Sequence, residues 1–379
     1  MHISADIAVA GAGVAGLWIA RRLRADGYSV VVASDGTPGD GQTIASQGIV
    51  HSGLKYALGG SLTAASERIA DMPDYWRACL RGETDIDLRA TRVTSEQFYM
   101  MADASVTSRV TAFFGGQLTA GRSRSLSRAD FPGTLRSGTF RGSVFEMSDF
   151  VLDARSLLET LGHGLTILEG RASPTVSDGA VTALQLSSGD TIEARHYVFA
   201  AGAGNEELIA AAGLPWATQR RPLCQVSVHA GDLSPLFAHS VSLRHGSKPR
   251  VTVTSHRDQD NTIVWYLGGN IAETGVKRTD EAQAAFARQE LTALFPWIGG
   301  LKDATYRCHR IDRAEPAAKL QRPNEPACLT RANVTTCWPI KLTMAPMLAN
   351  QVRAAVEALA PCRPQPDPTV SAVASPPWI

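Results

Sequence analysis

Asp6-Ile7-Ala8-Val9-Ala10-Gly11-Ala12-Gly13-Val14-Ala15-Gly16, residues 6–16, is the stretch of sequence that decides the fold. A short apolar segment precedes three glycines in Gly-x-Gly-x-x-Gly spacing. Residues 17–25 then carry apolar side chains at helical spacing, and Gly27 ends that helix. Residues 28–33 read as a second apolar strand. This order makes a βαβ unit, and its short crossover favours a parallel sheet.

The three glycines predict a site for a dinucleotide. Gly11 permits the tight turn, Gly13 lets the backbone approach a pyrophosphate, and Gly16 lets the helix pack against the strand. The helix N-terminus adds free N–H groups and a partial positive charge, so Val14 and Ala15 are expected to contact phosphate. A glycine-rich turn without a ligand is the alternative, but it leaves the complete βαβ context unexplained.

The end of the second strand departs from the usual pattern. An acidic residue normally stands there and bonds the ribose hydroxyls. Here the position holds Ser34, followed by Asp35. We expect one of these two side chains to contact the cofactor. Alternatively, Asp35 only opens a surface turn with Gly36.

Residues 42–56, Gln-Thr-Ile-Ala-Ser-Gln-Gly-Ile-Val-His-Ser-Gly-Leu-Lys-Tyr, resemble a segment of the D-amino-acid oxidase superfamily of FAD-dependent oxidoreductases. That superfamily includes glycine oxidase, sarcosine oxidase and L-2-hydroxyglutarate oxidase, and its segment follows the pyrophosphate to the flavin ring. The resemblance implies FAD as cofactor and FAD contacts at Thr43, Ser46, Gln47, Gly48 and Ile49.

The same resemblance implies two residues close to the reacting centre. His51 would lie near the isoalloxazine, either as a hydrogen-bonded residue or, as in some relatives, as a covalent FAD attachment. Tyr56 is a second candidate for the catalytic site. Lys55 precedes it where hydroxyglutarate oxidases have another tyrosine, which sets this substrate site apart from theirs.

Three further stretches resemble the superfamily. Residues 151–158 resemble a helix start, and residues 197–204 resemble the strand that returns under the dinucleotide. Residues 338–346 precede the final helix, whose N-terminal amides would face flavin O2 and N1 and stabilise the negative charge of the reduced ring. The further cofactor contacts that this implies are Ala172 at the adenine, Ala201, Gly202, Lys341, Leu342 and Thr343.

The predicted fold is α/β with an α+β second lobe: a Rossmann-like FAD-binding domain with a parallel sheet, plus a substrate domain with a mostly antiparallel sheet. Strand-like runs such as 250–254 and 262–266 place the second sheet. The FAD-binding domain is expected in three parts and the substrate domain in two, followed by a disordered tail that holds six of the 20 prolines. The boundaries are 1–80, 146–215 and 326–360 for the first, 81–145 and 216–325 for the second, and 361–379 for the tail.

An arginine is the side chain best suited to hold a substrate carboxylate, because its fork binds both oxygens. Arg310 is the first candidate, since residues 310–315 resemble the superfamily's Arg-Pro-x-Thr-Pro-Asp at Arg310 and Glu315. Arg313 is a rival, and a solvated ion-pair network among these residues is the alternative. Lys341 matches a lysine of sarcosine oxidase that contacts the substrate carboxylate. Cys308 matches, by spacing alone, the cysteine that anchors FAD there, although an inert thiol is the plainer interpretation.

The length and composition of the chain limit the classes of protein to which it can belong. The chain has 379 residues, which suggests two lobes, and its formal net charge of +1 gives no electrostatic argument for nucleic acid or an anionic membrane. No apolar run reaches the ~18 residues of a membrane span. The start of the chain shows no basic leader, so we expect a cytoplasmic protein. The six cysteines and nine histidines lack the spacing of a disulfide framework or a metal site, so neither is predicted.

The sequence therefore predicts an FAD-dependent oxidoreductase that moves a hydride to flavin N5 from a C–H next to an amine or hydroxyl. The substrate would be a small molecule with a carboxylate, and the electron acceptor oxygen or a quinone. A NAD(P)-binding reductase and a non-catalytic flavin-binding partner subunit are the alternatives.

Overall fold

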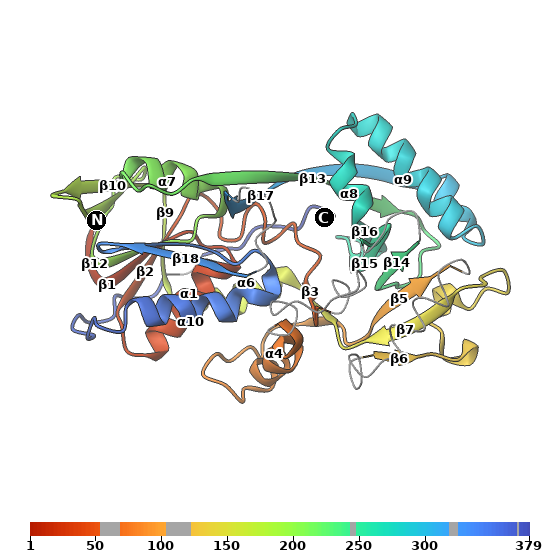
Figure 1. The fold of residues 1–379 in the computed structure, drawn as a ribbon, viewed down its shortest axis with the longest axis horizontal. Coiled ribbons are helices and arrows are strands. Elements are labelled where there is room, and N and C mark those ends of the chain that lie inside the picture. The colour runs from red at the N-terminus through yellow and green to blue at the C-terminus, as the bar shows by residue number, and fades with distance from the viewer. Residues whose placement is uncertain (54–68, 104–122, 243–247, 318–324, 370) are drawn as a thin grey trace.

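The computed structural model describes residues 1–53, 69–103, 123–242, 248–317, 325–369 and 371–379. Two sheets of eight strands each lie side by side along the long axis of the molecule (Figure 1). A small three-stranded sheet, with β3 (Ile49–Val50), β8 (Phe150–Leu152) and β4 (Val93–Ser95), joins them. Within the described residues, no helix is long and apolar enough to cross a membrane.

The first sheet contains the predicted βαβ unit. Its path runs β10-β11-β12-β1-β2-β9, and β19 and β18 extend it from β12. The central pairs are parallel, whereas the β10–β11–β12 and β18–β19 pairs are antiparallel. The strands are β1 (His2–Ala10), β2 (Val30–Ser34), β9 (Thr166–Glu169), β10 (Ala172–Ser177), β11 (Ala180–Leu186), β12 (Thr191–Phe199), β18 (Ala327–Arg331) and β19 (Val334–Trp338).

Helices cover both faces of this sheet because its strands are apolar on both sides. On one face, α1 (Val14–Ala25), α6 (Ala154–Gly162) and α10 (Ala345–Ala355) share a buried core with Ile7 and Val9 of β1. On the other, Leu208 of α7 (Asn205–Ala211) packs against the alternate residues Ala8 and Ala10. The carboxyl ends of β1, β2 and β12 therefore remain open for a ligand.

The second sheet runs β17-β13-β16-β15-β14-β5-β7-β6 and is antiparallel except between β14 and β5. Helices α8 (Asn270–Gly275) and α9 (Asp280–Leu294) lie against it. The strands are β5 (Phe98–Ala102), β6 (Ser123–Ser125), β7 (Ser143–Met147), β13 (Thr218–His229), β14 (Ala238–Val241), β15 (Val251–Arg257), β16 (Ile263–Gly268) and β17 (Thr305–Pro316).

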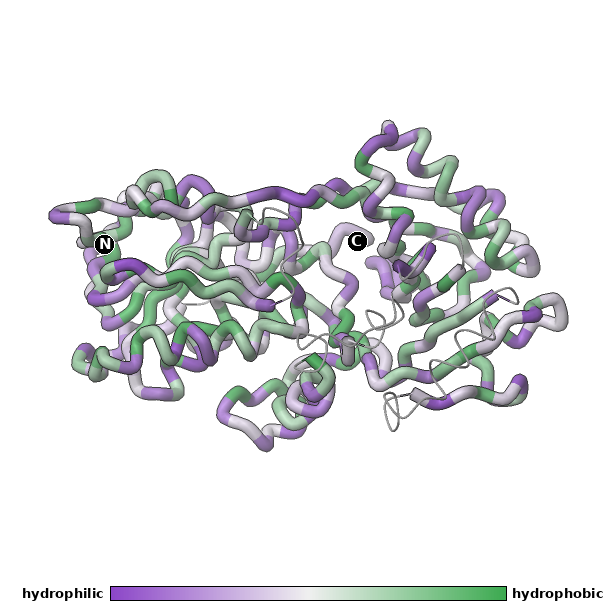
Figure 2. Tube along the Cα trace, in the orientation of Figure 1, coloured by the Kyte–Doolittle hydropathy of each residue, from purple (hydrophilic) through white to green (hydrophobic). Residues whose placement is uncertain are grey.

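This architecture confirms the predicted α/β fold class with a mostly antiparallel second sheet. Strands of the two sheets alternate along the chain. The predicted division into domains stays a prediction. Strands β13 and β17 have 12 residues each and run between the two halves (Figure 1). Figure 2 shows this crossing stretch as largely hydrophilic, in contrast to the apolar strands within each half.

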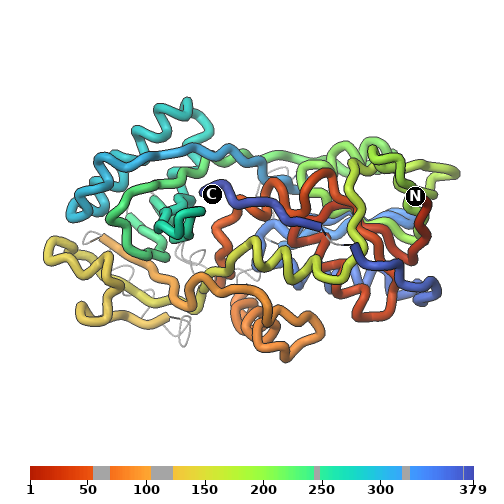
Figure 3. Tube along the Cα trace, turned by 180° about the vertical axis from the view of Figure 1, so that it is seen from behind, coloured from red at the N-terminus to blue at the C-terminus, as the bar shows by residue number. Residues whose placement is uncertain are grey.

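The C-terminal segment differs from the disordered tail that its prolines led us to expect. It lies across the back of the molecule and ends between the two halves (Figure 3). Thr369 exchanges hydrogen bonds with Ile167 on β9, and Ala374 N donates to Pro38 O at 3.0 Å. The ring of Trp378 is buried and stacks on His256 at 3.9 Å. An extended proline-rich chain can bind an open strand edge in this way, because it needs few intrachain hydrogen bonds.

Candidate functional site

A cavity of about 830 Å³ opens where the two halves meet. The first half contributes the loops after β1, β2 and β12 and the segment before α10. The second contributes β13, β17, the end of β16 and α8. The volume suits a cofactor-sized ligand, and a crevice at the carboxyl ends of parallel strands is where such sheets bind ligands.

One end of the cavity is formed by the predicted glycine turn. Gly11 has φ +115°, and a Cβ at Gly16 would overlap the carbonyl oxygen of Gly11, so the turn and the close packing of α1 both require glycine. At Gly13, the N-cap of α1, a Cβ would meet only Thr43 Oγ1, at 3.0 Å. The backbone at Gly13 is therefore open to the cavity, as a cradle for an anionic phosphate must be.

The next part of the cavity lies beyond the end of β2. Ser34 is buried there, and Asp35 is exposed and pairs with Arg171 Nε at 3.1 Å. Both residues line the cavity together with Ala172, the first residue of β10. Asp35 thus forms an exposed ion pair at the rim of the cavity, and its contact with the cofactor stays a prediction.

Residues 43–49 form the floor between the two halves. Thr43 Oγ1 accepts a hydrogen bond from Val14 N at 3.1 Å. The Gln47 amide donates to Tyr266 O at 2.9 Å and to Thr254 Oγ1 at 3.2 Å, so this side chain ties the floor to the second sheet. The predicted residues on the cavity wall are Gly11, Gly13, Val14, Ala15, Ser34, Asp35, Thr43, Ser46, Gln47, Gly48, Ile49, His51, Ala172, Ala201, Gly202, Arg310, Lys341 and Leu342.

Two predicted cofactor residues stand behind the wall rather than on it. Gly16 packs against the turn, as described above. Thr343 is buried, and its Oγ1 accepts a hydrogen bond from the backbone N–H of His51 at 2.8 Å. Thr343 thereby fixes the segment that carries His51. Tyr56 lies outside the described residues.

The segment before α10 is strained. Ile340 has φ +64°, an unusual value for a β-branched residue, and Lys341 N donates to Pro339 O at 2.7 Å across it. Lys341 is the N-cap of the short helix Leu342–Met344 that leads into α10. The strain places Lys341 and Leu342 on the cavity wall beside a helix N-terminus, which is suited to a group that becomes negatively charged.

His51 belongs to a buried polar pair. Its Nδ1 lies 3.1 Å from a carboxylate oxygen of Asp149, whose other oxygen accepts hydrogen bonds from Ser52 N, at 2.8 Å, and Ser52 Oγ. Burial by itself would raise the pKa of Asp149, but the hydrogen bond and charge interaction with His51 and the hydrogen bonds from Ser52 outweigh it and lower that pKa. The carboxylate therefore stays ionised next to the imidazole.

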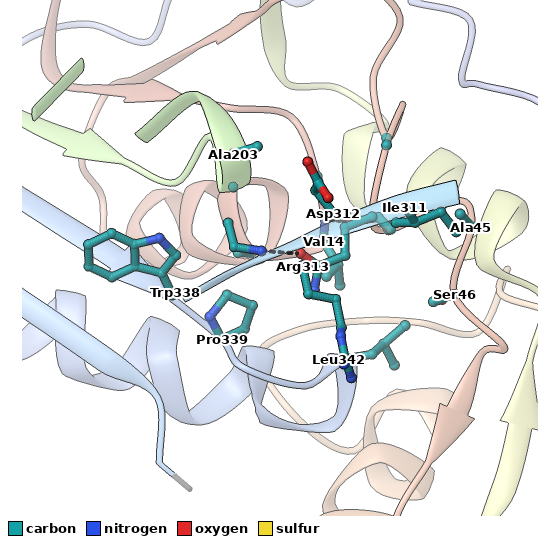
Figure 4. A pocket seen from close by; sticks show the side chains of 18 of the residues that line it. Val14, Ala45, Ser46, Ala203, Ile311, Asp312, Arg313, Trp338, Pro339 and Leu342 are labelled. Carbon is teal, nitrogen blue, oxygen red and sulfur yellow. Dashed lines mark hydrogen bonds between the residues drawn. The ribbon is translucent and has the colours of Figure 1, made fainter. Parts of the chain in front are cut away.

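The two candidate arginines of β17 face different partners. Arg310 is 46% exposed and binds Asp280 of α9 through Nε at 2.9 Å and Nη2 at 2.8 Å. Arg313 is 16% exposed and lies 3.8 Å from Glu273 of α8. Figure 4 shows Arg313 extending across the cavity toward Leu342. Arg313 is therefore better placed than Arg310 to meet a ligand near the last helix.

Arg313 is part of a charged cluster formed by β13, β17, α8 and Lys248, which precedes β15. Lys248 binds Glu273 at 2.7 Å, and Arg221 binds the buried Glu315 at 3.0 Å. Burial would raise the pKa of Glu273, but the ion pairs with Lys248, Arg313 and Arg221 lower it, so it remains anionic. These described residues comprise three cations and two carboxylates. The cluster thus carries an excess positive charge, which favours an anionic ligand.

Two groups of described residues bring three metal-type donor atoms within 4.8 Å of one another. In the first, His51 and Asp149 hydrogen-bond one another beside His239, which explains their proximity without an ion. In the second, Cys224, Cys308 and Asp280, the carboxylate already holds Arg310. Burial raises the pKa of the Cys308 thiol to about 12, and Cys308 does not line the cavity.

Sequence reasoning missed several residues of this site. Asp149 is 98 positions from its partner His51, and Lys248 and Glu273 have no motif around them. The positive φ of Ile340 also lacks a sequence pattern, because glycine or asparagine normally marks such a turn. These residues become visible only when the two halves are brought together.

Comparisons with known proteins agree on one family. The family model described as FAD dependent oxidoreductase matches residues 6–319. A curated relative from Pseudomonas aeruginosa, named "Probable FAD-dependent oxidoreductase PA4991", is 42% identical over 360 residues, which cover 94% of this chain and 91% of the relative. The crystal structure of that protein superposes with a TM-score of 0.86 at 38% identity and covers 100% of this chain and 98% of its own.

More distant solved structures share the fold. Glycine oxidase from Geobacillus kaustophilus has a TM-score of 0.66 at 16% identity and covers 94% of this chain and 95% of its own. L-amino acid deaminase from Proteus vulgaris has a TM-score of 0.66 at 15% identity, with 96% and 92% covered. At such identities the likeness concerns the fold alone.

Proposed function

The chain belongs to the family of FAD-dependent oxidoreductases, and from that premise we propose that it oxidises a small carboxylate-bearing amine or alcohol. FAD is the cofactor of the family, which leaves no support for the alternative of a nicotinamide-dependent reductase. The described residues fit FAD: the backbone at Gly13 is open beside the N-terminus of α1, and the cavity continues from there to the start of α10. When bound, FAD supplies a two-electron acceptor for a hydride.

The chain's own residues would divide the work along the cavity. Gly11, Gly13 and the first amides of α1 would hold the pyrophosphate, and Ser34 and Ala172 would flank the adenosine. Lys341 and the amides that follow it would favour the reduced ring, because a cation and a helix N-terminus both stabilise negative charge. Thr343 would support this arrangement from behind through His51.

The observation that carries the substrate proposal is the position of Arg313. Its guanidinium extends toward Leu342 across the cavity, inside a cluster with excess positive charge (Figure 4). A planar fork in that place would bind a carboxylate through two hydrogen bonds and hold the neighbouring C–H toward the ring. Arg310, the residue first favoured on sequence, is occupied by Asp280 on α9. Lys341 remains a second candidate for the same carboxylate.

The test compares Arg313→Met with Arg310→Met. The wild-type protein is mixed anaerobically with a panel of small amino and hydroxy acids, and bleaching of the flavin absorbance is followed. In Arg313→Met the charge-assisted fork is lost, so the concentration of the best substrate that half-saturates flavin reduction should rise about 10- to 100-fold. Arg310→Met should change it less than about threefold. Equal behaviour of the two variants would refute the proposed anchor.

Two controls accompany this comparison. Arg313→Lys should recover little, because a point charge does not reproduce a bidentate pair. The flavin content of each variant should equal that of the wild type, since the proposed FAD contacts lie on the other half. The electron acceptor is then assigned from the reduced protein by comparing its reoxidation by oxygen and by a soluble quinone.

A further inference from the structure

We infer that His51, oriented by Asp149, is the base that removes the hydroxyl proton of the substrate, and that the substrate is therefore a 2-hydroxy acid. This inference rests on the proposed oxidation of a carboxylate-bearing substrate, and it chooses the alcohol over the amine. It is drawn from the geometry of the His51–Asp149 pair and from its place in the cavity.

The pair has a defined arrangement of protons. Asp149 is 1% exposed, and its oxygens are held by His51 Nδ1, Ser52 N and Ser52 Oγ. A carboxylate kept ionised by these contacts only accepts hydrogen bonds, so Nδ1 carries the proton. In the neutral imidazole the other nitrogen, Nε2, is then a proton acceptor. This is the arrangement in which a buried carboxylate prepares a histidine to act as a base.

The ring of His51 is also supported from the second half. It stacks on His239 of β14 with ring centroids 5.8 Å apart and planes inclined by 21°. His239 is buried and bonds Thr252 Oγ1 through Nδ1 at 2.8 Å. Asp149 and His239 are two titratable groups that contact His51 among the described residues. The stacking limits the rotation of the imidazole, so its second nitrogen has a fixed direction.

The proposed anchor and the proposed base approach the same end of the cavity. The backbone of His51 is tied to Thr343, the residue after Leu342, and His51 lines the cavity. Arg313 extends toward Leu342 from the other half (Figure 4). A small 2-substituted acid held by Arg313 would therefore have its 2-substituent within the part of the cavity that His51 lines.

The chemistry of the substituent decides which substrate needs this base. A 2-amino group loses its ammonium proton to water at moderately alkaline pH and can enter the site neutral. A hydroxyl is far less acidic, and its proton must leave as the carbonyl forms. In the inferred step the substrate's C–H bond breaks and its electron pair leaves as hydride, for which FAD, when bound, would be the two-electron acceptor. The O–H proton passes to His51 Nε2, and the C=O bond of a 2-oxo acid forms.

The main test uses His51→Asn with matched pairs of substrates: glycolate with glycine, L-lactate with L-alanine, and L-2-hydroxyglutarate with L-glutamate. The rate of anaerobic flavin reduction by the best hydroxy acid should fall about 100- to 10,000-fold. In the wild type this rate should decline as the pH falls and the base is protonated, and the decline should vanish in His51→Asn. His309→Gln is the matched control, because His309 bonds Ser227 at 2.9 Å and does not line the cavity.

Asp149 is a positioning residue, and its variants test the orientation of the proton. Asp149→Asn should slow reduction by the hydroxy acid and move the acid limb of the pH profile, and Asp149→Glu should restore part of the rate. Independently of turnover, ¹⁵N spectra of histidine-labelled protein should show His51 with its proton on Nδ1, and Asp149→Asn should change that tautomer. A purely structural pair would leave the pH profile unmoved. A proton found on Nε2 in the wild type would overturn the inference.

The outcomes separate this inference from the proposed function. If His51→Asn and the wild type reduce equally fast with the hydroxy acid, the inference is wrong. It is also wrong if only amino acids reduce the wild-type flavin, although the Arg313 anchor then stands. If His51→Asn slows flavin reduction but Arg313→Met is saturated at the wild-type substrate concentration, the role of Arg313 as anchor is wrong and the role of His51 stands. If no carboxylate reduces the flavin, both fall.

Discussion

The two walls of the cavity differ in the chemical groups that face it. The wall from the first half, here called the cofactor wall, consists of residues 10–15, 33–35, 200–204 and 337–342, and mostly backbone and small side chains face the ligand. The wall from the second half, here called the substrate wall, carries charged side chains of β17 and α8 and of residue 248. We therefore expect the cofactor wall to recognise its ligand by shape and backbone amides, and the substrate wall by charge.

The difference teaches how each wall responds to change. A backbone surface is lost when a side chain intrudes, because the packed turn beneath it has no room to adjust. A charged surface is altered by removing one guanidinium or carboxylate, and the strands that carry it remain folded. Substitutions in the cofactor wall should therefore act on folding and FAD retention, and those in the substrate wall on substrate saturation.

The largest effect is expected at Gly16. In Gly16→Ala the new Cβ overlaps the carbonyl oxygen of Gly11, so α1 must move away from β1. We expect a loss of about 3 kcal/mol or more of unfolding free energy and little FAD-loaded protein. Gly162→Ala in α6 is the control, because its Cβ would lie 3.6 Å from Ile167 in ordinary contact. Denaturant unfolding measures the stability of both variants. Equal unfolding free energies would contradict the claim that the turn beneath the cofactor wall has no room for a side chain.

Trp378 should have the next largest effect, because it joins the two halves behind the walls. Its ring is 4% exposed and packs on His256 and Tyr266, and Tyr266 O accepts the hydrogen bond from Gln47. Trp378→Ala should cost about 3 kcal/mol of unfolding free energy. Ile379→Ala, at a 40% exposed neighbour, should cost much less. Thermal unfolding of the two variants decides whether the tail is part of the fold.

Gly13 should separate cofactor binding from folding. A side chain there meets only Thr43 Oγ1 in the protein but enters the space expected for the pyrophosphate. Gly13→Val should fold, yet bind FAD about 100-fold more weakly. Gly133→Val is the control, since no atom lies within 4 Å of its Cβ. FAD titration of the apoprotein by flavin fluorescence gives the affinity, and full retention of FAD would place the phosphate cradle elsewhere.

The contrast between the walls also explains what the sequence could predict. The cofactor wall follows from local spacing, because the tasks of Gly11, Gly13 and Gly16 are set within one turn. The parallel sheet and the antiparallel second sheet follow from the same kind of local pattern. A family resemblance then supplied FAD, which the family match confirms. The roles of the individual site residues stay predictions.

The substrate wall depends on contacts between distant parts of the chain. Arg310 and Arg313 are three positions apart on β17 and therefore point to opposite faces of the strand. Which arginine meets Asp280 of α9 and which meets Glu273 of α8 depends on how these helices pack against β13 and β17, and the sequence alone does not give this packing. The tail was misjudged for the same reason, because its partner strand β9 lies about 200 positions earlier, as in the Thr369–Ile167 contact.

The smallest effect is expected at Asp35, a carboxylate of the cofactor wall near the space proposed for the adenosine. Its side chain is 62% exposed and pairs with Arg171, which is 64% exposed, so the contact is screened by water and salt. If FAD binding depends on backbone and small residues, Asp35→Asn should change FAD affinity less than about threefold. Asp40→Asn, at another exposed carboxylate that lines the cavity, is the matched control. A carboxylate that bonded the ribose would be worth roughly tenfold or more in affinity. A loss of that size in Asp35→Asn alone, measured by flavin fluorescence at two salt concentrations, would show that the cofactor wall also uses charge. In that case Asp35 would leave Arg171 for the ribose when FAD binds.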